Sequence, residues 1–186
     1  MLLHQKIKGL EDFFKRQGER KPKGVYFYRI NSYDETILEF IRKYYDLAKR
    51  EGAIIDKNIE NPTADNIAYF NEIIGDKYVH GPGFMAEALK KWLPRIKDYQ
   101  RASIADGIYD TLEVLRRQGK NIDILKNNFI RIMCWLYYNF YNIMERLGND
   151  EVPKIIFWGN VNFSELSTLK ILSNAGADII LVQPGG

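Results

Sequence analysis

The most hydrophobic part of the chain is the run from Ile122 to Leu147, and its pattern predicts one long helix. The run reads IDILKNNFIRIMCWLYYNFYNIMERL, and its second half is apolar or aromatic on nearly every side. A helix of this kind lies either in a large core or in a membrane. Arg131, Asn139 and Asn142 interrupt the run, so no unbroken apolar stretch is long enough for a bilayer. We therefore predict a central buried helix that includes Trp135, and no membrane span.

Six further segments carry apolar residues at helical spacing or are bounded by helix start and stop signals. Gly52 and Gly119 follow two of these segments and Pro94 follows a third, as expected where helices end. Thr63 is placed to cap a helix that begins after Pro62. The predicted helices are Leu2–Gln17, Glu35–Glu51, Thr63–Gly75, Phe84–Leu93, Asp98–Gln118 and Phe163–Asn174.

Four short runs rich in β-branched, aromatic or aliphatic residues predict strands. Two lie near the N-terminus, at 25–30 and 53–56, and two near the C-terminus, at 154–158 and 178–182. The second pair encloses a helix, which is the β-α-β pattern of parallel strands with a right-handed crossover. The predicted fold class is α/β, with a helix-rich N-terminal region that leads into a Rossmann-like β-α-β unit.

Two strands are too few to stand as a sheet, so the C-terminal unit is expected to be incomplete by itself. Either residues 25–56, which show a small β-α-β pattern of their own, complete it, or the chain is the front of a longer protein. The pattern favours the second interpretation. The predicted domains are a basic N-terminal helix and linker at 1–24, a mostly helical region at 25–150, and the start of an α/β domain at 151–186.

The net charge of +3 is concentrated at the N-terminus. Residues 1–24 contain seven lysines and arginines against three carboxylates, so the remainder of the chain is slightly acidic. Nucleic-acid binding needs a basic face on a folded module, and a short basic arm is more often solvated surface, so nucleic acid is not an expected partner.

The single cysteine, Cys134, lies in the apolar helix and cannot form an internal disulfide. Without a signal-peptide pattern, the expected compartment is the cytoplasm.

Glycine-containing turns follow both C-terminal strands and are the best candidates for a ligand site. In open α/β sheets, ligands bind at the carboxyl edge, where glycine lets backbone amides approach and a helix N-terminus attracts anions. The alternative is that these are ordinary turn and cap residues, because the chain has neither a GxGxxG nor a P-loop motif. The candidate ligand-binding residues are Gly159, Asn160, Ser164, Pro184, Gly185 and Gly186.

Three other features are weaker candidates. His80 lies in a loop with two glycines and a proline, but a loop-stabilising histidine is the commoner case, and no acid partner is evident. Asp106 and Asp110 share a helix face without the Glu-x-x-His pattern of a metal-binding bundle, so we assign no metal, cofactor or catalytic residue. The segment Lys90–Arg101 interleaves basic and aromatic side chains. It suits a phosphate or an acidic partner, although an amphipathic helix junction is the simpler explanation.

Several strings of residues, considered together, resemble a known family. They are KGVYFYRINSYDETILEFIRKYY, ENPTADNIAYFNEIIGDKYVHGPGFMAEALKKWLPRI, MCWLYYNF, VPKIIFWGN and ILSNAGADIILVQPGG. They are similar to the bacterial YceG-like family, described as a component of a biosynthetic module and distinct from the lytic transglycosylase of the same name. Its members are encoded with TerD-type tellurite-resistance and general stress proteins. Family members are longer, so the resemblance implies an N-terminal portion, and it implies no catalytic residues because the family has no established reaction.

Two hypotheses follow from the residues and the resemblance. The leading one is a component of a cytoplasmic tellurite-resistance and stress-response system that binds a nucleotide or a phosphorylated small molecule at its strand-end loops. The rival is a non-enzymatic interaction module that docks TerD-type partners through its aromatic helices. Neither hypothesis assigns a reaction.

Overall fold

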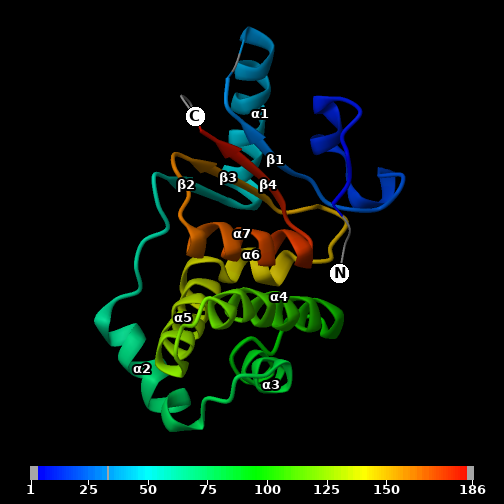
Figure 1. The fold of residues 1–186 in the computed structure, drawn as a ribbon. Coiled ribbons are helices and arrows are strands. Elements are labelled where there is room, and N and C mark those ends of the chain that lie inside the picture. The colour runs from blue at the N-terminus through cyan, green and yellow to red at the C-terminus, as the bar shows by residue number, and fades with distance from the viewer. Residues whose placement is uncertain (1–3, 33, 184–186) are drawn as a thin grey trace.

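The computed structural model describes residues 4–32 and 34–183, and its centre is a four-stranded parallel sheet (Figure 1). The strands are β1 (Phe27–Ile30), β2 (Ala53–Asp56), β3 (Lys154–Trp158) and β4 (Asp178–Val182). Helices cover both faces of this sheet, so the protein has the predicted α/β fold.

The strand order β1-β4-β3-β2 joins the two ends of the chain in one sheet. β3 and β4 form the predicted central pair, with Ile155 beside Ile179. β1 and β2 lie at opposite edges, so residues 25–56 do not form a small sheet of their own. They complete the central pair, which corrects the expectation that the C-terminal β-α-β unit is incomplete within this chain. On its outer side, each central strand has backbone N–H and C=O groups that need hydrogen-bond partners. β1 provides these partners for β4, and β2 provides them for β3.

The predicted helices are confirmed for most of the chain, with small shifts at their ends. Asp34 and Thr63 cap two of them, since their side-chain oxygens accept hydrogen bonds from the backbone N–H groups of Ile37 and Asn66. The α-helices are α1 (Glu35–Glu51), α2 (Ala64–Ile74), α3 (Pro82–Trp92), α4 (Asp98–Arg117), α5 (Ile122–Cys134), α6 (Tyr141–Arg146) and α7 (Phe163–Ala175). A short 3₁₀ turn, η3 (Gly75–Lys77), follows α2.

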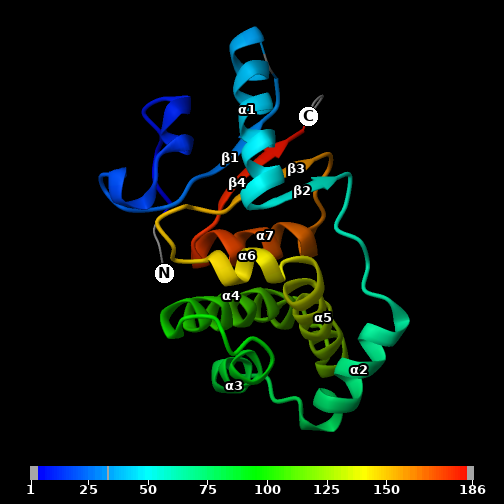
Figure 2. The same cartoon turned by 180° about the vertical axis from the view of Figure 1, so that it is seen from behind.

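The helices are unequally divided between the two faces of the sheet (Figures 1 and 2). α1 covers one face, where Ile156 and Ile180 pack with Phe40 and Tyr44. α7 covers the other face, and α4, α5 and α6 form a further layer beyond it. The larger core lies on this second side. Alternate strand residues, such as Phe157, point into it.

The predicted helix at Leu2–Gln17 is wrong. Residues 10–14 and 17–19 form two short 3₁₀ turns, η1 (Leu10–Phe14) and η2 (Gln17–Glu19), and Met1–Leu3 lie outside the described residues. His4 forms a β-bridge with Val25, and the Gln5 N–H donates to the Val25 carbonyl at 2.9 Å. The arm therefore extends the β1 side of the sheet. Its backbone groups find hydrogen-bond partners there, whereas a separate helix would satisfy these groups within itself.

A buried charge cluster ties this arm to the sheet at the start of β4. The Asp178 carboxylate, fully buried, accepts hydrogen bonds from Arg20 Nη1 at 2.8 Å, Lys154 Nζ at 2.7 Å and the Tyr26 N–H at 2.9 Å. The Tyr44 hydroxyl donates to the Asp178 carbonyl at 2.9 Å. Arg20, predicted within a solvated linker, is thus part of the core. Burial lowers the pKa of Lys154, although Asp178 opposes that shift.

The long helix predicted at Ile122–Leu147 is interrupted. α5 ends at Cys134, a π-helical turn, η4 (Trp135–Asn139), follows, and α6 resumes at Tyr141. The Phe140 N–H donates to the Trp135 carbonyl at 3.0 Å, which is the i to i+5 bond of a π-helix. The run is buried as predicted, since Trp135 is 2% exposed and its indole N–H donates to the Glu60 carbonyl at 2.9 Å. Among the described residues, no helix is both long and apolar enough to cross a bilayer.

Replacing Trp135 with alanine should lower the free energy of unfolding by about 3–5 kcal/mol, because the ring fills core space that the surrounding helices cannot close. Tyr138→Ala is the matched control, since Tyr138 lies three residues further along and is 43% exposed. It should cost less than about 1 kcal/mol. Urea denaturation monitored by circular dichroism measures both changes, and a near-neutral Trp135→Ala would contradict the assignment of this run to the core.

Candidate functional site

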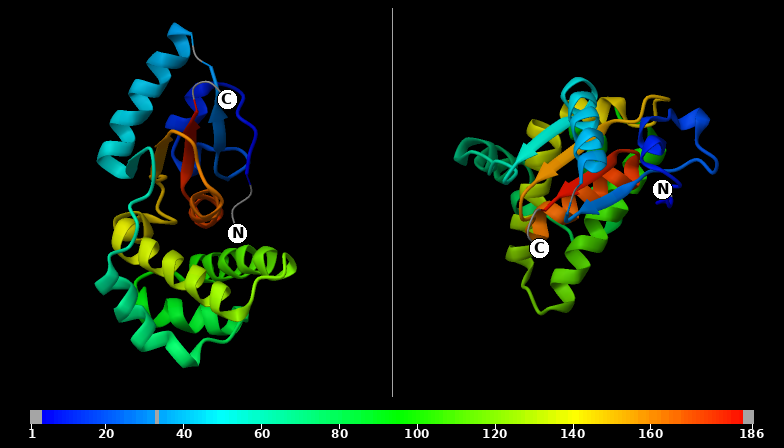
Figure 3. Two further views of the ribbon diagram at one scale, coloured as in Figure 1. Left: turned by 60° about the vertical axis from the view of Figure 1, so that its left-hand side comes forward. Right: turned by 90° about the horizontal axis from the view of Figure 1, so that it is seen from above.

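The carboxyl ends of all four strands lie along one edge of the sheet, because the strands run in the same direction (Figure 3). This is the edge at which the turn residues were predicted to bind a ligand. Exposed polar side chains follow three of the strands there. They are Asn31 and Ser32 after β1, Lys57 and Asn58 after β2, and Asn160 after β3.

Gly159 holds the loops after β2 and β3 together. Its φ is +127°, and a Cβ at this position would lie 3.2 Å from the Lys57 Cα. Its N–H donates to the Val182 carbonyl at 2.9 Å, and the Lys57 N–H donates to the Trp158 carbonyl at 2.7 Å. Only glycine allows both this dihedral angle and this backbone approach, so the glycine predicted at the turn has a structural reason to be there.

The first turn of α7 lies beside these loops and is fixed by a capping box. The Asn162 side chain accepts from the Glu165 N–H at 3.0 Å, and Glu165 Oε2 accepts from the Asn162 N–H at 2.9 Å. Glu165 Oε1 accepts from the Ile59 N–H at 2.8 Å, which binds the β2–α2 segment to the helix start. Ser164, a predicted site residue, lies partly buried within this turn, where Asn162 rather than Ser164 is the cap.

Lys57 is the charged residue among those at this edge that the sequence pattern did not indicate. Its φ is +73°, in the left-handed region, and its side chain is exposed. A residue other than glycine, asparagine or aspartate rarely adopts this conformation, and such strained positions cluster at functional sites. A lysine gives no signal of backbone conformation in a sequence, so only the structure shows it.

α1 also begins at this edge, on the opposite face of the sheet from α7 (Figures 1 and 2). The chain thus leaves β1 toward one face and β3 toward the other, with the end of β4 between them. There the Gln183 N–H donates to the Ile30 carbonyl at 2.9 Å. This is the topological position at which open α/β sheets bind ligands. The predicted residues Pro184, Gly185 and Gly186 follow directly and lie outside the described residues.

His80 lies away from the sheet edge, in the loop before α3. Its Nε2 lies 2.6 Å from Glu113 Oε1, its Nδ1 lies 3.3 Å from the Tyr78 hydroxyl, and its ring stacks on Tyr109. Glu113 also accepts from Arg116 Nε at 2.7 Å. These contacts use both ring nitrogens and hold the loop against α4. The partner Glu113 is 33 residues away in the chain, which is why the sequence did not reveal it.

The bonds to Arg116 and then to His80 lower the pKa of Glu113 from 4.5 to about 2. A carboxylate with a lowered pKa in the folded state stabilises the protein above its unfolded pKa and loses that contribution as the pH falls through the folded value. The cluster is therefore a source of acid sensitivity.

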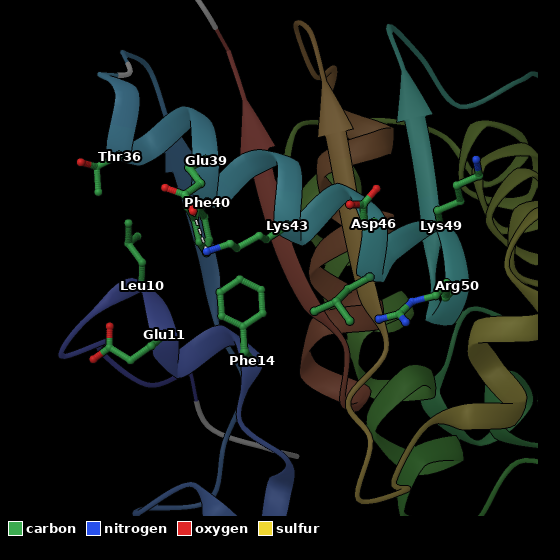
Figure 4. A pocket seen from close by; sticks show the side chains of 11 residues that line it. Leu10, Glu11, Phe14, Thr36, Glu39, Phe40, Lys43, Asp46, Lys49 and Arg50 are labelled. Atoms are coloured by element: carbon green, nitrogen blue, oxygen red, sulfur yellow. Dashed lines mark ion pairs between the residues drawn. The ribbon is translucent and has the colours of Figure 1, made fainter.

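A hollow that does not belong to the sheet edge lies on the outer side of α1 against η1 (Figure 4). It has a volume of about 810 Å³, with Phe14 and Phe40 among its apolar side chains. Charges of both signs surround it, including the ion pair of Lys43 and Glu39 at 2.7 Å. Three carboxylates and three cations line this hollow, so its charge balance favours neither an anion nor a cation.

The described part of the chain shows neither a group of metal ligands nor a reactive thiol. Within residues 4–32 and 34–183, no three His, Cys, Asp or Glu side chains are grouped as metal ligands would be. Cys134 is buried, and burial raises the pKa of its thiol to about 11. A thiol with a raised pKa is a poor nucleophile at neutral pH.

The fold and the sheet edge define an α/β protein with a small parallel sheet and a candidate ligand-binding edge. The model of the YceG domain family matches residues 6–186, and the chain belongs to this family. Comparisons with curated proteins and with solved structures found no match.

Replacing Glu113 with glutamine should flatten the loss of stability between pH 4.5 and 2, because the variant no longer takes up a proton at this position on unfolding. The stability difference between the native protein and the variant should be largest above pH 4.5 and shrink toward pH 2. Urea unfolding at a series of pH values measures this difference. Glu87→Gln, at an exposed position on α3, is the control, and parallel pH curves for Glu113→Gln and the native protein would refute the assignment.

Proposed function

We propose that the carboxyl edge of the sheet binds a nucleotide or a phosphorylated small molecule. The observation that carries this proposal is the left-handed, exposed Lys57, which the Gly159 turn holds beside the start of α7. The proposal concerns binding, and it assigns no catalytic group.

Two features of the edge suit an anionic ligand. α1 and α7 both direct their N-terminal ends to this edge, where each helix carries a partial positive charge that the Asp34 and Glu165 carboxylates offset in part. The Lys57 ammonium adds a full charge that can approach a phosphate from the β2 side. Asn58 and Asn160 provide amide groups that can bind the polar remainder of a ligand, such as a sugar or a base.

The proposal has a direct test in thermal-shift measurements with inorganic phosphate, nucleotides and sugar nucleotides. A ligand at one hundred times its Kd should stabilise the native protein by about 2.7 kcal/mol. Lys57→Ala should abolish that stabilisation. Lys57→Gly should also abolish it while leaving the unliganded protein as stable as the native one or more so, because glycine relieves the left-handed strain.

One further site variant and one control make the result specific. Asn160→Ala should weaken ligand stabilisation without removing it, and Lys49→Ala, on the exposed side of α1, should leave it unchanged. Ligand stabilisation that survives in Lys57→Gly, or a native protein that no tested ligand stabilises, would contradict the proposal.

A second function is supported by a group of exposed and half-buried aromatic side chains, here called the aromatic surface. It comprises Tyr69, Trp92, Tyr137, Tyr138 and Tyr141, from α2, α3, η4 and α6. Tyr69 and Tyr138 are 45% and 43% exposed. Exposed tyrosine and tryptophan are typical of protein-binding surfaces. On this view the protein acts in a cytoplasmic tellurite-resistance and stress-response system by docking TerD-type proteins, a context that rests on the family resemblance.

The docking function predicts that the purified chain captures a TerD-type protein, and that Tyr69→Ala with Tyr138→Ala lowers the capture by about tenfold or more. Both rings are exposed, so the double variant should keep its native fold. Lys57→Gly should not affect capture. A pull-down that yields no TerD-type protein, or equal capture by the double variant, would refute docking through this surface.

A further inference from the structure

A hollow of about 510 Å³ lies within the aromatic surface, beside the π-helical turn. Two tyrosines and the Trp92 ring line it together with Pro94 and two cations, Lys91 and Arg95. The Lys91 ammonium lies 5.1 Å from the centre of the Trp92 ring. The hollow thus combines aromatic walls with positive charge.

The π-helical turn brings these rings together. An i to i+5 bond adds one residue to a turn, which rotates the residues after it around the helix axis. Tyr137 contacts both Tyr138 and Tyr141 edge-on, with ring centres 4.9 and 6.1 Å apart. In the same layer, Trp92 packs edge-on against Tyr69 at 5.5 Å.

The charge of the hollow favours an acidic occupant. The segment Lys90–Lys97 contains four cations and no carboxylate. Arg95 forms an ion pair with Glu145 at 3.0 Å and is 75% exposed, which leaves most of its guanidinium open to a second anion. Charge complementarity of this kind determines partner choice and the rate of encounter.

The packing of the rings favours a polypeptide over single-stranded nucleic acid. Bases bind proteins by stacking on open aromatic faces. Here the aromatic rings meet edge to face, and Lys91 covers one face of Trp92. Edge-to-face rings form niches for aliphatic and aromatic side chains, while the lysine and arginine at the rim can bind glutamate or aspartate.

We propose that the hollow between α3, η4 and α6 binds an acidic segment of a partner protein, with apolar side chains against Trp92 and Tyr137 and carboxylates on Lys91 and Arg95. This assignment rests on the proposed docking function and adds the chemistry of the partner. It gives Lys91 and Arg95, two of the cations in the segment Lys90–Arg101, a role that the sheet-edge site does not provide.

The test uses the full chain and three labelled polymers: a random copolymer of glutamate and tyrosine, polyglutamate, and oligothymidylate. Fluorescence anisotropy should show the copolymer binding most tightly. Lys91→Glu with Arg95→Glu should weaken this binding by about tenfold or more, because both carboxylate contacts become repulsive. Lys49→Glu with Arg50→Glu makes the same charge change on α1 and should alter binding by less than about twofold.

The three tryptophans provide an independent readout, because each occupies a different place. Trp92 lies in the hollow, Trp135 is 2% exposed in the core, and Trp158 ends β3 at the sheet edge. Copolymer binding should change the emission of Trp158→Phe and leave that of Trp92→Phe unchanged. The two variants therefore distinguish binding in the hollow from binding at the sheet edge.

Several outcomes would overturn the assignment. Absence of copolymer binding, or equal binding by Lys91→Glu with Arg95→Glu, would refute the acidic-segment site. Oligothymidylate binding as tight as the copolymer, and lost in the same variant, would replace it with a nucleic-acid site. If the charge variant captures a TerD-type protein as well as the native chain does, this inference fails while docking stands. If neither chain captures it, docking itself fails.

Discussion

The fold depends on one buried carboxylate at the start of the last strand. Asp178 binds Arg20 and the backbone of Tyr26 from the N-terminal segment and Lys154 of β3, so the two ends of the chain meet on it. Leaving such cations buried without their partner is costly, which makes the cluster a strong constraint on which segments can pair. The Tyr44 hydroxyl anchors α1 at the same point through the Asp178 carbonyl. The amino end of the sheet is thereby closed by charge and packing, and the carboxyl end is left for exposed loops.

Much of the fold follows from local patterns, because caps and strand runs act within a few residues. Asp34 and Thr63 cap their helices as their residue types predict, and the four strands lie where the apolar runs placed them. The contact between Arg20 and Asp178 spans 158 residues, and no periodicity reveals it. The π-helical turn is equally hidden. In a run that is apolar on every side, one extra residue in a turn leaves the hydrophobic pattern unchanged, so a continuous helix was the natural prediction for Ile122–Leu147.

The candidate site was also predictable only in part. Gly159 was predictable because a glycine after a buried strand marks a turn, and the structure adds the reason, a backbone approach to Lys57. Lys57 itself was not predictable, since its importance lies in a dihedral angle rather than in its residue type. For His80 the loop was evident but the partner Glu113 was not, because it comes from a helix that follows in the chain. Sequence patterns thus predicted which edge of the sheet carries the candidate site. The contacts between its loops could be identified only from the three-dimensional structure.

The segment that carries Lys57 explains how a strained lysine can persist. A left-handed conformation costs a residue other than glycine roughly 1–2 kcal/mol. Three hydrogen bonds hold the segment: the Lys57 N–H to the Trp158 carbonyl, the Ile59 N–H to Glu165, and the indole N–H of Trp135 to the Glu60 carbonyl. Each is worth about 1 kcal/mol, so together they offset the strain. Their anchors lie on β3, α7 and the π-helical turn. The position of the lysine at the sheet edge is therefore set by both layers of the molecule, and the turn that shapes the aromatic surface also helps to hold the candidate phosphate-binding residue in place.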